Sequence, residues 1–306
     1  MRGVMASLCT EAMSGSAPSF KPILAALAGV ACLSLMDAFM KFGALAIGTF
    51  TAAWLRSVIG TGLVLPFWLA KGGRWPKGRV MRLHLLRGLV STFMALSFFY
   101  ALTKLPIAEA IAISFVAPLL ALYFARLILG EEVHRRAVIG SMLGFAGTLV
   151  IVGGKIGRSN FDVDTALGLG ALLFSALLYA YNFIVIRQQS QVADPAEIAT
   201  FHSGVSAFVL ALAAPFLFVM PNMMEMGAIA IAGVLTVAGA VAVAWAYARA
   251  ETQLLVPMEY TGFLWASLFG WLFFREMVTA TAIAGTICIV TGCWIATRRP
   301  RTAALH

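Results

Sequence analysis

The stretch APLLALYFARLILGEEVHRRAVIGSMLGFAG, residues Ala117–Gly147, has a counterpart further along the chain. Residues Gly262–Gly292 read GFLWASLFGWLFFREMVTATAIAGTICIVTG, and the two stretches align without a gap at an offset of 145 residues. Such a constant register inside hydrophobic sequence indicates two copies of one membrane unit. Leu119, Glu131 and Gly147 return as Leu264, Glu276 and Gly292, and upstream Gly88, Lys104 and Phe115 correspond to Gly233, Arg249 and Tyr260.

The composition indicates an integral membrane protein. Of the 306 residues, 61% are hydrophobic and only 11% are charged, and the mean hydropathy is +0.92. A soluble core does not need that much apolar surface. The apolar stretches run to about 18–24 residues, the length that crosses a hydrocarbon core roughly 30 Å thick.

Ten such stretches can be drawn, five in each half. Because five is odd, the two halves lie upside down relative to each other, as is typical of secondary transporters. The predicted fold class is all-α integral membrane, with ten transmembrane helices as two inverted five-helix repeats. The predicted spans are Pro22–Phe42, Ile47–Ala70, Val80–Thr103, Ile107–Leu129, Ala137–Gly154, Thr165–Arg187, Ala196–Met220, Met226–Arg249, Leu254–Phe274 and Val278–Thr297.

The predicted domains follow from these spans. They are a tail at 1–20, a first repeat at 21–154, a linker at 155–164, a second repeat at 165–298 and a tail at 299–306. The residues before Lys21 include Glu11 and no long apolar run, so no signal peptide is expected.

The distribution of basic residues predicts the orientation. Of the 22 Lys and Arg residues, 15 fall on the side that holds both tails, and Arg56 and Arg87 fall inside spans. Basic residues accumulate on the cytoplasmic side, so both termini are expected there. The net charge of +9 is thus a topology signal, and no basic soluble patch interleaved with aromatic residues indicates nucleic-acid binding. The opposite side holds only Lys41, Lys104, Lys155, Arg158 and Arg275.

One block carries a family resemblance. Phe98–Val133, FFYALTKLPIAEAIAISFVAPLLALYFARLILGEEV, is echoed by Pro257–Val278, PMEYTGFLWASLFGWLFFREMV. This pattern resembles the EamA-type transporters of the drug/metabolite transporter superfamily over roughly Pro22–Thr297. The resemblance implies the same five-plus-five inverted repeat, alternating access and no cofactor. The halves differ at Pro118, which has Phe263 as its counterpart.

The resemblance leaves the substrate open. Size and layout look like the bacterial amino-acid exporters, including the aromatic amino-acid group, so export of amino acids across the bacterial inner membrane is the expected function. The Leu86–Gly88 segment and the Glu259–Tyr260 pair look like riboflavin and S-adenosylmethionine uptake relatives. Uptake or exchange of such a vitamin or drug-like metabolite is the alternative.

An enzyme and a channel are more distant alternatives. The sequence contains no HExxH, no GxSxG and no paired-aspartate prenyltransferase motif. No metal site is expected, because none of the four histidines has a metal-ligating partner at helical spacing. Nothing in a single chain forms a symmetric channel filter. The histidines are His84, His134, His202 and His306.

Polar residues inside the apolar spans predict a substrate cavity. Ionisable groups in a bilayer are costly and usually face a cavity. The resemblance and these residues predict a cavity bounded by the first, third, fourth, sixth, eighth and ninth spans, with aromatic walls and with the fifth and tenth spans outside. The candidate substrate-binding residues are Ser34, Asp37, Phe93, Tyr100, Ser114, Tyr179, Asn182, Trp245, Glu259 and Tyr260.

Several of these residues have alternative interpretations. Asp37 can instead neutralise Lys41 one helical turn away. Glu259 can couple protons, contact substrate or tether helices. Arg56 and Arg87 can meet a substrate carboxylate, although Arg87 is close enough to the basic side to extend its charge into water.

Prolines and glycines predict features of the scaffold. Pro118 and Pro257 each remove a helix hydrogen bond, which makes them candidate hinges or static bends. Gly140, Gly144 and Gly147, with Gly285 and Gly292, give the fifth and tenth spans small faces for close packing. That packing is expected within the chain, and a homodimer contact is the alternative.

Overall fold

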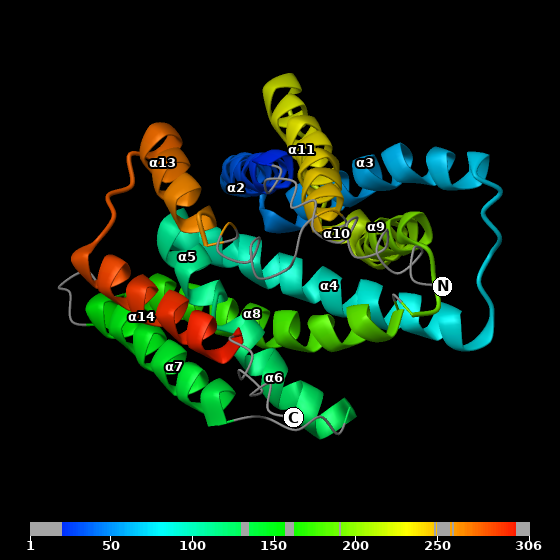
Figure 1. Cartoon of the computed structure of the whole chain (residues 1–306). Helices are drawn as coiled ribbons and strands as arrows, with labels where there is room; N and C mark the ends of the chain where they lie inside the picture. The colour runs from blue at the N-terminus through cyan, green and yellow to red at the C-terminus, as the bar shows by residue number, and fades with distance from the viewer. Residues whose placement is uncertain are drawn as a thin grey trace, which may run out of the picture.

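The computed structural model describes residues 20–129, 135–156, 162–189, 191–247, 249, 258 and 260–297. Regular secondary structure in these ranges is helical throughout (Figure 1), and each helix overlaps a span predicted from the sequence. The helices are α2 (Phe20–Ile47), α3 (Thr49–Ala70), α4 (Gly78–Lys104), α5 (Ile107–Ser114), α6 (Ala117–Leu129), α7 (Arg135–Ile156), α8 (Val163–Gln189), α9 (Pro195–Ala211), α10 (Ala214–Leu217), α11 (Met223–Tyr247), α13 (Gly262–Phe274) and α14 (Ala280–Thr297).

Six helical segments of the described chain are long and apolar enough to cross a membrane. They comprise α2, α3, α4, the α5–α6 segment, α8 and α11. Their outward surfaces are also apolar: Leu127 is 78% exposed and Val241 is 62% exposed. A helix that is apolar on every side suits a lipid environment. The chain is therefore all-helical with the character of a membrane protein.

The fourth predicted span is divided into two helices. Helix α5 ends at Ser114, a turn covers Phe115 and Val116, and α6 begins at Ala117. Pro118 is thus the second residue of α6. Proline is tolerated there because the first turn of a helix has no use for its missing N–H. The structure interrupts the fourth span at this point, and the hinge role of Pro118 stays a prediction.

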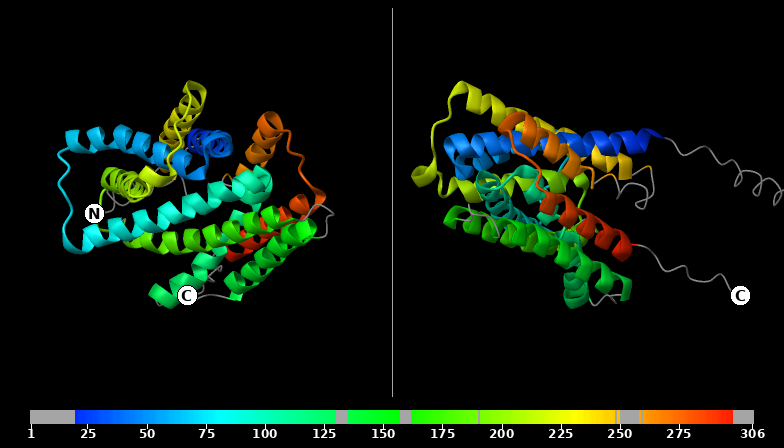
Figure 2. Two further views of the ribbon diagram at one scale, coloured as in Figure 1. Left: turned by 180° about the vertical axis from the view of Figure 1, so that it is seen from behind. Right: turned by 90° about the vertical axis from the view of Figure 1, so that its left-hand side faces the viewer.

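The principal helix contacts join the two halves of the chain. Helix α2 packs on α11, α4 on α8, α3 on α9 and α7 on α14. Figure 1 shows α7 and α14 side by side along one edge, away from α2, α3 and α11. Figure 2 shows the start of α2 and the end of α14 on the same side of the molecule.

Glycines allow α7 and α14 to approach closely. A Cβ atom added at Gly147 would lie 2.5 Å from the carbonyl oxygen of Gly285, and one at Gly292 would collide with that of Gly140. No larger residue fits either position without moving backbone. The small faces predicted from the sequence therefore pack against each other within the chain.

A buried ion pair ties α2 to α5 and α13. Lys41 pairs with Glu276, just beyond α13, and Lys41 Nζ also donates to the carbonyl oxygen of Leu105 at 2.7 Å. The second carboxylate oxygen of Glu276 accepts the N–H of Ile107 at 2.8 Å. Lys41 thus takes Glu276 as its salt-bridge partner, whereas the sequence had suggested Asp37.

A second polar network lies near the opposite end of α4. His84 Nε2 is 2.8 Å from Glu197 Oε1, and the amide of Gln189 reaches His84 Nδ1. Arg87 Nη1 donates to Gln189 Oε1 at 3.0 Å, so α8 holds this partly exposed side chain. Phe201 stacks on the His84 ring with 4.6 Å between centroids. This network connects α4, α8 and α9.

Candidate functional site

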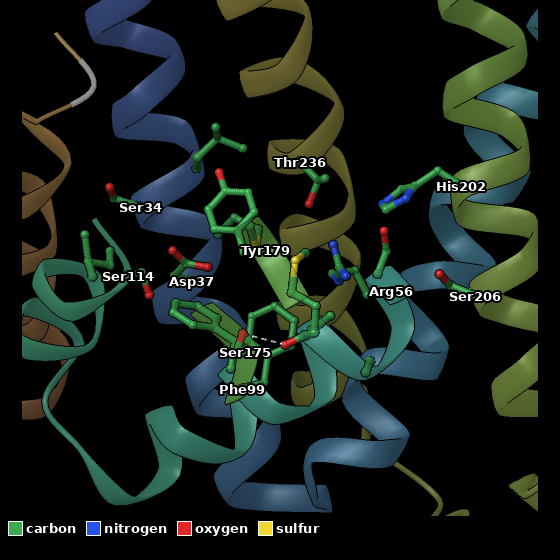
Figure 3. Close-up of a pocket in the computed structure, with 18 of the residues that line it drawn as sticks. Ser34, Asp37, Arg56, Phe99, Ser114, Ser175, Tyr179, His202, Ser206 and Thr236 are labelled. Carbon is green, nitrogen blue, oxygen red and sulfur yellow. Dashed lines mark hydrogen bonds between the residues drawn. The ribbon is translucent and has the colours of Figure 1, made fainter. Parts of the chain in front are cut away.

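A cavity of about 770 Å³ lies between the helices of the two halves (Figure 3). Its lining draws on all six spans expected from the sequence: α2, α4, α5–α6, α8, α11 and the ninth span, which contributes Tyr260 and Gly262. Helices α3 and α9 also contribute, which was not expected. Among the described residues, none of the lining belongs to α7 or α14.

One end of the cavity carries an acid and two hydroxyls. Ser34 and Asp37 are three residues apart on α2 and therefore share a helix face. Ser114 lies beside them in Figure 3 and donates its hydroxyl hydrogen to the carbonyl oxygen of Ala110 at 2.9 Å, which leaves oxygen lone pairs for a ligand. Within the described part of the chain, the Asp37 carboxylate makes no hydrogen bond or salt bridge. It is available to a cationic group.

The other end of the cavity carries basic side chains. Figure 3 shows Arg56 from α3 and His202 from α9 there, with Ser206 nearby and Tyr179 between this end and Asp37. The Arg56 guanidinium lies 5.2 Å from the centre of the Phe99 ring. Its Nε is buried and, among the residues described, has no hydrogen-bond partner. Arg56 is therefore available to an anion.

Aromatic and aliphatic side chains form the walls between these ends. Tyr179 stacks on Phe183 at 4.8 Å between ring centroids, and Phe115 meets Tyr260 edge to face at 5.4 Å. The Ser175 hydroxyl donates to the Met94 carbonyl at 2.9 Å and fixes α8 against α4. These walls suit an apolar substrate body.

The candidate residues from the sequence divide into three groups. Ser34, Asp37, Ser114, Tyr179 and Tyr260 line the cavity. Glu259 and Pro257 lie outside the described residues.

The third group is described but lies outside the lining. Asn182 is buried and accepts a hydrogen bond from Ser91 at 3.5 Å. Phe93 is 48% exposed, and Tyr100 is only partly buried. Trp245 lies under Arg249, with 4.3 Å between the guanidinium carbon and the ring centre. These four residues do not line the cavity in this structure, and their contact with substrate stays a prediction.

His202 is the lining residue that sequence reasoning missed, and Arg56 was considered but not chosen. Arg56 lies on α3 and His202 lies on α9, and the resemblance did not assign either helix to the cavity. The available signal was a basic group well inside an apolar span. In the described part of the chain, no group of three or more His, Cys, Asp or Glu residues could hold a metal ion.

The comparison with known protein families decides the classification. The model of the EamA-like transporter family matches two segments, residues 20–153 and 166–298. The chain belongs to the EamA-like transporter family. It is therefore a membrane transporter of the drug/metabolite transporter superfamily.

Named relatives cover most of the chain. The pseudopaline exporter CntI of Pseudomonas aeruginosa is 28% identical over 275 residues, which cover 89% of this chain and 93% of the exporter. The S-adenosylmethionine uptake transporter of Rickettsia prowazekii is 23% identical and covers 84% of this chain and 85% of its own. A solved crystal structure shares the fold with a TM-score of 0.61 and 23% identity, over 89% of this chain and 96% of that one.

Proposed function

We propose that this protein is a secondary transporter that exports amino acids or closely related amphipathic zwitterions by alternating access. The observation that carries the proposal is that Asp37 and Arg56 line one cavity, while neither forms a salt bridge with any described residue. An amino acid carries both complementary charges, since its ammonium fits Asp37 and its carboxylate fits Arg56.

The energetics support this pairing. Unpaired charges surrounded by apolar helices are costly, and a ligand that neutralises both offsets the cost. Guanidinium binds a carboxylate through two parallel hydrogen bonds. The cavity volume of about 770 Å³ falls within the range of small-molecule sites and leaves room for a side chain against Tyr179 and Phe99.

We also propose that the scaffold is ten spans in two inverted repeats. Under the 145-residue offset the α2–α11 contact becomes the α8–α4 contact, while α7–α14 maps onto itself. The Gly147–Gly285 approach likewise maps onto Gly292–Gly140. Contact between equivalent residues is expected near an axis that relates the halves, and the rings of Phe115 and Tyr260 make such a contact. The double match of the family model supports the same arrangement.

The test is counterflow of labelled amino acids in proteoliposomes. We expect Asp37→Asn and Arg56→Gln each to lower transport at least about tenfold, because each removes a charge-assisted contact with the substrate. Asp164→Asn and Arg82→Gln are matched controls on exposed residues outside the cavity, and both should transport like the wild type. An Arg56→Gln protein that folds and transports normally would refute the proposal.

Uptake is a second candidate direction, favoured by the S-adenosylmethionine uptake relatives. The pseudopaline exporter, with the higher identity, favours export. Accumulation in inside-out vesicles but not in right-side-out vesicles would support export, and the reverse pattern would support uptake.

A further inference from the structure

The basic end of the cavity carries more hydrogen-bonding groups than a single substrate carboxylate would use. Arg56 and His202 both line it, and the ring nitrogen His202 Nδ1 is buried without a hydrogen-bond partner among the described residues, as is Arg56 Nε. Buried polar atoms are rarely left unsatisfied, so each such atom requires an explanation. Two such atoms at the same end of one cavity indicate a ligand group that is absent from the free protein.

The local packing of α3 and α9 forms this end. His202 and Ser206 are four residues apart, so they occupy one face of α9. Ser203, the next residue after His202, also lines the cavity. A Cβ atom added at Gly60 would lie 3.2 Å from Ser203 Oγ, so the glycine leaves space beside this hydroxyl. Ser206 donates to the Gly88 carbonyl at 3.4 Å, which presents its oxygen in a fixed position. Arg56 faces the same space from α3.

The cavity lining has more side chains that can donate a hydrogen bond to an anion than it has acidic side chains. Asp37 is the one acidic residue among the described lining residues, whereas Arg56 and His202 both offer N–H donors to an anion. A monocarboxylic amino acid satisfies Asp37 and Arg56 and leaves His202 unused. A second carboxylate on the substrate would accept hydrogen bonds from His202 and from the hydroxyl of Ser203, which also lines the cavity.

We propose that His202, with Ser203, forms a second carboxylate subsite beside Arg56. The substrate class is then amino acids or amino-acid derivatives with a carboxylate beyond the amino-acid head group. This inference rests on the proposed function, because it takes the Asp37–Arg56 pair as the binding site for that head group.

The experiment compares two amino acids of equal chain length. Equilibrium binding to the purified full-length protein is measured for L-2-aminoadipate, which has a second carboxylate, and L-norleucine, which has none. We expect aminoadipate to bind about tenfold more tightly, the effect of one charge-assisted hydrogen-bond group. His202→Gln should remove this preference by weakening aminoadipate alone, whereas His202→Lys should keep it. Arg56→Gln should weaken both amino acids.

Two further results separate the possible outcomes. If the wild type binds both amino acids equally, or His202→Gln leaves the ratio unchanged, the subsite is refuted while the proposed function stands. If neither amino acid binds, the proposed function is wrong and the subsite falls with it. Should His202→Gln fail to fold, Ser203→Ala provides the second test, because it should reduce the preference without affecting norleucine.

Discussion

The ammonium of Lys41 pairs with the carboxylate of Glu276, 235 residues further along the chain. The two side chains are only 5% and 15% exposed, so this pair is shielded from water. The Glu276 carboxylate also accepts a hydrogen bond from the N–H of Ile107 at the start of α5. One carboxylate therefore joins three helices that belong to both halves.

We expect Glu276→Gln to destabilise the protein by about 3 kcal/mol, because it removes the carboxylate charge from a buried ion pair. Thermal unfolding in detergent measures the change. The double variant Lys41→Met, Glu276→Gln should recover part of the loss, since both charges are then absent. Equal stability of the single variant and the wild type would contradict this role.

Gly147→Val should destabilise the protein by about 1–3 kcal/mol, because its side chain would meet the Gly285 carbonyl at the α7–α14 contact. Gly153→Val on the same helix is the matched control, since an added Cβ there meets nothing within 4 Å. Light scattering in detergent should give the same oligomeric state for both. A loss of dimer without a loss of stability would instead support the homodimer contact.

Asp162 should make the start of α8 sensitive to acid. The backbone N–H and the hydroxyl of Thr165 donate to its carboxylate, and the backbone hydrogen bond contributes most to holding the pKa of Asp162 below its ordinary value of 3.8. A lowered folded-state pKa gives stability that is complete above pH 3.8 and is lost as the pH falls through the folded value. The protection of the Thr165 amide against hydrogen exchange, relative to its intrinsic rate at each pH, should therefore fall below pH 3.8. Asp162→Asn should cap the helix without this pH dependence.

The charge asymmetry predicts that the α3–α4 loop is cytoplasmic and the loop before α11 is periplasmic. In a cysteine-free background, Lys77→Cys should resist an impermeant thiol reagent in intact cells, whereas Met223→Cys should react. Both positions are exposed on the protein surface. The opposite labelling pattern would invert the orientation.

The sequence predicted the helices closely because apolar span length is set by the bilayer. The start of α4 at Gly78 lies two residues from the predicted Val80, and α3 ends at the predicted Ala70. The form of the interruption at Pro118 could not be predicted, because a proline can either bend a helix or begin one. Only the backbone around Phe115 distinguishes the two.

Part of the cavity lining was predicted from charged and polar residues inside apolar spans, and not from span length. Asp37 stood out because a carboxylate in an apolar span usually faces a cavity. The partner of Lys41 could not be predicted, since Glu276 is adjacent in space only after α2 and α13 pack together. His202 was missed because the side of α9 that faces the cavity cannot be predicted from a span that is apolar on most sides.

The pairing of helices across the two halves has a consequence for biogenesis. Because α2, α3, α4 and α7 each find a main neighbour in the second half, the first half synthesised alone would expose unmatched surfaces such as Gly147 and Asp37 within the bilayer. We therefore expect each half to depend on the other for stability, as the subunits of an obligate dimer do. Two separately expressed fragments cut within residues 157–161 should assemble into a working protein, whereas either fragment alone should be cleared by membrane proteases.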